Sequence, residues 1–170
     1  FLATWKLGIG AGCLLGEKIS KHRAELALVP SGEIGLSLFL IDISFVTPAP
    51  VSSAGALMSL REFMATSYGF RLLFDFLMMS VAGGLFILPL FTFLQERSQK
   101  SHLSRVIAGN NVFNAVFMVV SALAVMGLHM AGVTQTQTLL ILAGVNLAFC
   151  AYIFHSVPEY KERIKALWKP

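Results

Sequence analysis

Charged and amide side chains interrupt the long apolar runs of this sequence, and they are the residues whose types and spacing could do chemistry. Arg71 and Asp75 lie four residues apart, so a helix would place them on one face, where they should pair. Asn110 and Asn114 have the same spacing, with Asn111 beside them. Such groups either contact a polar ligand or a gate, or join neighbouring helices by hydrogen bonds. The spacing leaves both interpretations open.

Glu33 is a further candidate for a functional residue because it lies deep in an apolar run, whereas Asp42 lies near the outer end of the same run. Ionisable groups inside apolar segments are costly, and they often mark functional sites. The candidate substrate or gating residues are therefore Arg71, Asp75, Asn110, Asn111, Asn114 and Glu33.

The histidines and cysteines, by contrast, do not predict a reactive site. The four histidines are spread along the chain, whereas metal ligands must converge. Cys13 and Cys150 lie within apolar runs, where a thiol packs like a small hydrophobic group. The acyltransferase pattern His-x-x-x-x-Asp begins at none of the histidines. We therefore expect no metal, no cofactor and no enzymatic activity in this chain.

The elements that must position the candidate residues follow from the composition. Of the 170 residues, 56% are hydrophobic and 13% are charged, and the mean hydropathy is +0.73. An ordinary soluble domain has about 25% charged residues. A water-soluble core could not hide this much apolar surface, which excludes a soluble enzyme, a disordered segment and a disulfide scaffold. We predict a polytopic membrane protein.

Five apolar stretches predict membrane-spanning helices, each of which needs about 20 residues. The runs are continuous, and backbone polar groups in a bilayer must pair within their own segment, so we predict an all-α bundle rather than a β-barrel. The predicted helices are 1–16, 26–46, 70–94, 106–132 and 138–157. Because the first is short and begins at Phe1, we expect a piece of a longer protein.

Lysine and arginine gather in alternate connections between these stretches. Three lie in 17–25, three in 95–105 and four after residue 157, but only one lies in 47–69 and none in 133–137. Since basic residues are retained on the cytoplasmic side, the chain should begin outside and end with a cytoplasmic C-terminus. The net charge of +4 therefore reflects topology rather than nucleic-acid binding.

Small residues predict contacts between helices, because they let two backbones approach closely in lipid. The expected packing glycines are Gly8, Gly12, Gly16, Gly83 and Gly84. Pro89 lacks a backbone donor, so its stretch could instead bend and serve a gate. Outside the spans, 57–64 could form a short interfacial helix. The tail 158–170 is basic and amphipathic, typical of a segment that lies on an anionic leaflet or anchors the last span.

Three longer motifs follow one another along the chain: RLLFD at 71–75, GGLFILPL at 83–90 and SHLSRVIAGNN at 101–111. In this order they resemble the lysophospholipid-transporter branch of the major facilitator superfamily, and especially the branch fused to a 1-acylglycerol-3-phosphate acyltransferase. The segments ALVP at 27–30 and SVPE at 156–159 fit the same branch. The segment 12–23 is similar to a degenerate form of the superfamily's cytoplasmic loop signature.

This resemblance implies that 1–157 belong to the C-terminal half of a twelve-helix transporter and that 158–170 form a cytoplasmic tail. It implies alternating-access transport of lysophospholipid in the bacterial inner membrane, in support of reacylation. The implied partners are membrane lipids, the substrate, the remaining transporter helices and an acyltransferase beyond residue 170. A facilitator that exports a drug, sugar or siderophore stays open, as does a membrane anchor for a fused acyltransferase.

Overall fold

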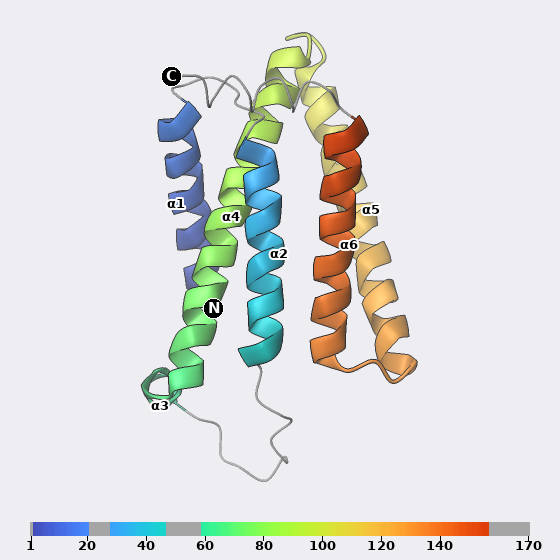
Figure 1. The fold of residues 1–170 in the computed structure, drawn as a ribbon. Helices are drawn as coiled ribbons and strands as arrows, with labels where there is room; N and C mark the ends of the chain where they lie inside the picture. The colour runs from blue at the N-terminus through green and yellow to red at the C-terminus, as the bar shows by residue number, and fades with distance from the viewer. Residues whose placement is uncertain (1, 21–27, 47–58, 157–170) are drawn as a thin grey trace.

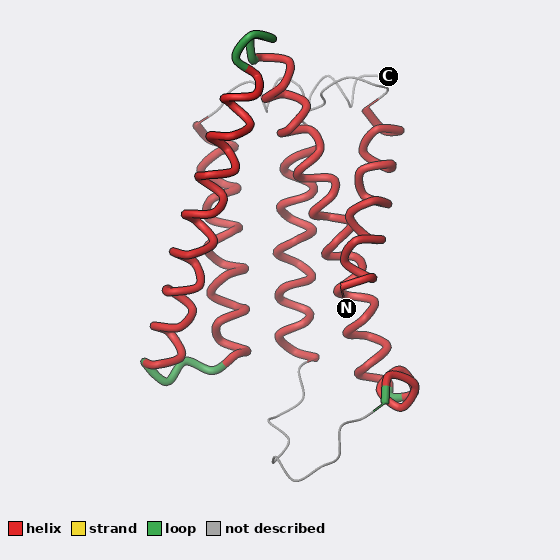
Figure 2. Tube along the Cα trace, turned by 180° about the vertical axis from the view of Figure 1, so that it is seen from behind, coloured by secondary structure: helices red, strands yellow, loops and turns green. Residues whose placement is uncertain are grey.

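The apolar runs fold into helices, which are the elements that carry every candidate residue. A computed structural model describes residues 2–20, 28–46 and 59–156, and this part of the chain contains helices and no strand. The helices are α1 (Leu2–Ser20), α2 (Leu28–Val46), α3 (Leu60–Ala65), α4 (Ser67–Arg97), α5 (Leu103–Met130) and α6 (Gln135–Ser156) (Figure 1). The tube in Figure 2 shows the same arrangement from behind. The prediction of an all-α fold is confirmed.

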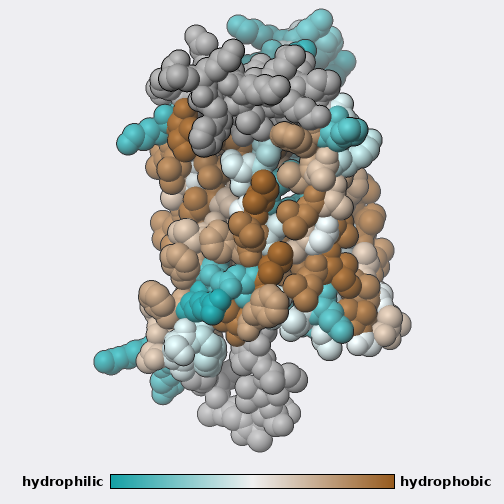
Figure 3. Space-filling model, viewed as in Figure 1, coloured by the Kyte–Doolittle hydropathy of each residue, from teal (hydrophilic) through white to brown (hydrophobic). Residues whose placement is uncertain are grey.

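Four of the described helices, α2, α4, α5 and α6, are long and apolar enough to cross a membrane. Four of the five predicted spans are thus confirmed. The first stretch also forms a helix, but α1 carries Lys6, Glu17 and Lys18 and does not belong to this group. Apolar side chains cover the middle of the face shown in Figure 3, and hydrophilic side chains gather nearer its two ends.

The long helices run alternately up and down, with α4 between α1 and α2, and α2 between α4 and α6 (Figure 1). The connection from α4 to α5, which contains Lys100, lies at one end of the bundle. The connection from α5 to α6, residues 131–134, has no charge and lies at the other end. The basic segments 21–27 and 158–170 lie outside the described residues.

Capping side chains set where α3 and α4 begin. Ser59 caps α3 through a reciprocal pair of hydrogen bonds with Glu62, and the Thr66 hydroxyl accepts a bond from the backbone N–H of Gly69 at 3.2 Å. The short helix overlaps the predicted range 57–64, but it begins at Leu60 and ends at Ala65. α4 then continues through Pro89 to Arg97 as one helix.

Candidate functional site

α1 and α4 approach each other closely, and glycines bring the two backbones together. A Cβ atom added to Gly12 would lie 2.2 Å from the carbonyl oxygen of Val81, and one added to Gly84 would lie 2.5 Å from that of Ile9. At Gly8 an added Cβ would lie 2.4 Å from the Cβ of Ser80. We call these three residues the glycine contact. It fixes the face of α4 that α1 covers.

The other predicted packing glycines are less tightly enclosed. A Cβ at Gly16 would meet side-chain atoms of Leu85 and Leu88 at an ordinary 3.5 Å, and one at Gly83 would meet only Leu36 of α2, at 3.9 Å. The tight contact between α2 and α4 is instead made by Gly32, where a Cβ would lie 2.7 Å from the backbone nitrogen of Phe86. Sequence reasoning missed Gly32, although its three-residue spacing to Gly35 was a usable signal.

Polar side chains hold α2 against α6. The amide of Asn146 donates to the hydroxyl of Ser37 at 2.9 Å and to the backbone carbonyl of Glu33 at 3.1 Å. Ser37 is fully buried and Glu33 is 3% exposed. Glu33 therefore lies in the interface between two helices, next to the Cys150 thiol. Asn146 was not singled out from the sequence, because one asparagine in an apolar run has no partner visible from spacing.

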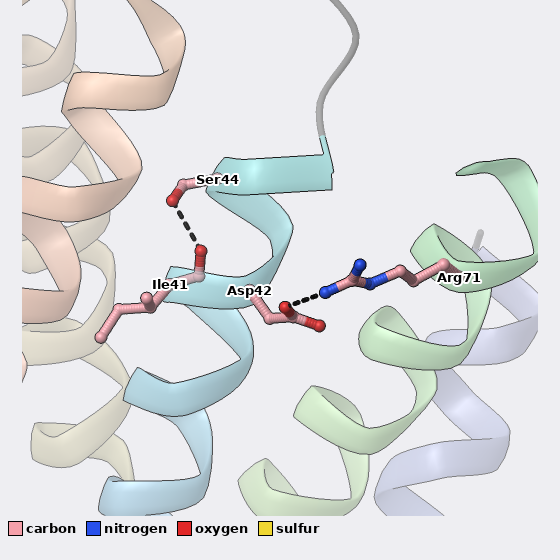
Figure 4. A network of polar contacts seen from close by, with 4 residues as sticks. All are labelled: Ile41, Asp42, Ser44 and Arg71. Atoms are coloured by element: carbon pink, nitrogen blue, oxygen red, sulfur yellow. Dashed lines mark hydrogen bonds and ion pairs between the residues drawn. The ribbon is translucent and has the colours of Figure 1, made fainter.

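Arg71 forms its ion pair with a residue that sequence spacing did not suggest. Its guanidinium donates to the Asp42 carboxylate on α2, joining α2 to α4 near one end of the bundle (Figure 4). The expected pair of Arg71 with Asp75 within α4 is therefore wrong for this conformation. The physical reason is that the helix contact brings a second carboxylate within reach, and both members of the observed pair stay partly exposed.

Asp75 lies close to this pair but is buried, with 2% of its surface exposed. The Asp42 carboxylate and the Arg71 guanidinium both act on it electrostatically. Its Oδ2 atom has no hydrogen-bond partner among the described residues. An unsatisfied buried carboxylate oxygen is costly, so its position calls for an explanation.

The predicted asparagines of α5 face a groove at the opposite end of α4. Asn110 and Asn114 line a cavity of about 180 Å³ between α4 and α5. Its apolar lining comes from one helix, namely Phe86, Ile87, Leu90, Phe91 and Leu94 of α4. Asn111 is exposed and does not line this groove. α5 itself has no buried residue along its length.

The structure thus separates the predicted residues into three places. Arg71 and Asp75 lie near the start of α4 with Asp42, Glu33 lies in the α2–α6 interface, and two of the asparagines line the α4–α5 groove. No group of three histidine, cysteine or acidic residues in the described ranges could hold a metal ion. The arrangement can bind polar groups and protons, and it presents an amphipathic groove.

These features define an all-α, multi-pass membrane protein with intramembrane polar groups on three helix pairs. No protein-family model, no curated protein and no solved structure matches the chain. The function therefore has to be argued from the groove, the polar groups and the order of the sequence motifs.

Proposed function

We propose that this chain is part of a transporter that moves a lysophospholipid across or between the leaflets of the bacterial inner membrane by alternating access. The observation that carries the proposal is the groove between α4 and α5. Amides from α5 stand opposite an apolar wall from α4. A lysophospholipid has a polar headgroup and a single acyl chain, so its two parts match the two kinds of lining.

Two asparagines give the groove its hydrogen-bonding capacity. Each amide offers two N–H donors and one acceptor oxygen, which suits the phosphate and glycerol oxygens of a headgroup. Phe86 and Leu90 lie against the same space and would contact the acyl chain. Sites for small molecules commonly combine a mostly apolar lining with a few polar groups that fix orientation.

The exposure of α5 supports a role at a boundary between helices. This helix is 28 residues long and apolar enough to span a membrane, yet none of its residues is buried. In the proposed transporter, helices outside this chain would cover α5 and complete the cavity. Substrate sites of such transporters lie between two halves, near the membrane midplane.

The proposal is tested by measuring lysophosphatidylethanolamine transport into proteoliposomes that contain the whole transporter. Replacing both Asn110 and Asn114 by alanine should lower the transport rate about thirtyfold, since two hydrogen bonds are lost and each is worth about 1 kcal/mol. Asn111→Ala is the matched control, because this amide lies on the same helix but outside the groove. It should leave the rate unchanged.

Competition identifies the class of substrate. Unlabelled lysophospholipid should reduce the measured transport, whereas sugars and other soluble solutes should not. Undiminished transport in the Asn110 and Asn114 double variant would contradict the groove as the substrate site. Equal competition by a soluble solute would contradict the proposed substrate class.

A further inference from the structure

The group formed by Asp42, Arg71 and Asp75 carries one carboxylate more than its single cation can neutralise. Arg71 donates to Asp42, so this carboxylate is satisfied as an anion. Asp75 is enclosed beside it, with one oxygen that has no hydrogen-bond partner in the described chain. Two adjacent carboxylates at an apolar site cannot both ionise cheaply, because each disfavours the charge of the other.

A proton on Asp75 resolves both costs. It removes the uncompensated charge from a side chain that is almost completely buried, and it converts a carboxylate oxygen into an O–H donor. Asp42 is the neighbouring acceptor, since its carboxylate lies against Asp75. A metal ion would resolve the charge equally well, but the described residues contain no third acidic, histidine or cysteine ligand here.

We propose that Asp75 binds a proton, which it shares with Asp42, and that release of this proton transfers Arg71 from Asp42 to Asp75. Arg71 and Asp75 are four residues apart on α4, a spacing at which oppositely charged side chains can pair along a helix. With Asp75 protonated, the Arg71–Asp42 ion pair joins α2 to α4. With Asp75 deprotonated, Arg71 pairs with Asp75 within α4. The released proton passes to water at this end of the bundle, where Arg71 and part of Asp42 are exposed.

Among the residues that the structure describes, Asp42 and Arg71 are the charged groups that act on Asp75. α2 contributes Asp42, and α4 contributes Arg71. α1 packs here through Trp5, whose ring lies 5.6 Å from that of Phe76, while the charged Lys6 is exposed. α3 also packs on α4, and its charged residues Arg61 and Glu62 are exposed.

The test is pH-dependent infrared difference spectroscopy of the purified protein in lipid vesicles. The carbonyl stretch of a protonated carboxyl group should be present at neutral pH, lost in Asp75→Asn and retained in Asp75→Glu. Glu33→Gln identifies any second band from the other buried carboxyl group. Glu62→Gln is the matched exposed control and should remove no band. Circular dichroism checks that each variant is folded.

Two neighbouring variants should move this band in opposite directions. Asp42→Asn removes the negative neighbour and frees Arg71 for Asp75, so the band should disappear at a pH lower by about one unit. Arg71→Gln removes the positive charge, so the band should persist to a pH higher by a similar amount. Arg71 is exposed, and its replacement leaves the packed interior intact.

If every protonated-carboxyl band that persists in Glu33→Gln also survives Asp75→Asn, the proposal is overturned. An Asp75 band whose pH dependence is the same in wild type, Asp42→Asn and Arg71→Gln also overturns it. The measurement uses no transported substrate, so its failure is distinguishable from failure of the proposed transport function.

Discussion

The two sides of α4 are built differently. Toward α1 and α2, α4 meets glycines, and backbone atoms of neighbouring helices approach so closely that a Cβ could not be inserted. Toward α5, α4 presents large apolar side chains across a groove, and the facing helix has no buried residue. The glycines of α5 agree with this difference, because a Cβ added at Gly109 or Gly127 would meet nothing within 4 Å.

This difference shows which helices of the bundle pack tightly and which does not. Helices in lipid gain little from apolar burial alone, so close association depends on small residues and interhelical hydrogen bonds. α1, α2 and α4 meet at close glycine contacts, and α6 is hydrogen-bonded to α2, whereas no described contact of either kind involves α5. α5 is therefore the helix whose position the described contacts fix least.

The largest expected effect comes from disrupting the packed side of α4, the side that contacts α1 and α2. Gly12→Leu places a side chain where the carbonyl oxygen of Val81 lies 2.2 Å from the first added carbon, so α1 and α4 must separate. Overpacking of this kind costs about 2 kcal/mol in the free energy of unfolding. Denaturant unfolding in mixed micelles, followed by circular dichroism, measures the loss.

Gly10→Leu is the control, because this glycine lies on the same helix and an added Cβ meets nothing within 4 Å. It should be neutral or slightly stabilising, since leucine favours a helix more than glycine does. Equal destabilisation by the two substitutions would show that the glycine contact does not hold α1 to α4.

A smaller effect is expected from the polar contact between α2 and α6. Asn146→Leu removes the amide that donates to Ser37 and to the backbone carbonyl of Glu33. Interhelical hydrogen bonds in membranes are worth about 1 kcal/mol, so the free energy of unfolding should fall by about that amount. The same unfolding measurement detects the change.

Asn111→Leu is the corresponding change on the open side of α4, where α4 faces α5 across the groove. Asn111 is exposed on α5, so this substitution should leave the free energy of unfolding unchanged. If Asn111→Leu destabilised the protein as much as Asn146→Leu, the distinction between the packed and the open side would be wrong.

The sequence predicted those features that depend on local spacing. Four spans followed from the lengths of apolar runs, and the spacing of Gly8 and Gly12 pointed to the α1 surface that meets α4. Partners distant in sequence could not be found this way. Arg71 pairs with a residue 29 positions away, and Asn146 donates to one 109 positions away.

The mistaken pair has an instructive cause. The rule for residues four apart detects every possible pair within one helix, but it contains no information about neighbouring helices. Asp42 lies on α2, which packs closely on α4 at Gly32 and Gly35, and it pairs with Arg71 across this helix contact. The competing partner therefore depends on contacts between helices, which the spacing within one helix does not contain.

The smallest effect concerns α3, which a local capping box stabilises in addition to its contacts with α4. The Glu62 carboxylate accepts hydrogen bonds from the backbone N–H and the hydroxyl of Ser59, both at 2.8 Å, and these bonds lower the pKa of Glu62. A lowered pKa in the folded state means that the stabilisation is complete above the ordinary glutamate pKa. It is lost as the pH falls through the lowered value.

Acidification should therefore increase hydrogen exchange in α3 while the glycine contact stays protected. Ser59→Ala removes the hydroxyl that bonds the Glu62 carboxylate and backbone N–H, but it keeps the backbone N–H that donates to Glu62, so the pKa of Glu62 should return only part of the way toward its ordinary value. Exchange in α3 should increase even at neutral pH, because one member of the capping box is lost. Nuclear magnetic resonance titration of Glu62, with amide exchange across 59–65, measures both effects, and unchanged exchange in Ser59→Ala would show that the cap does not stabilise α3.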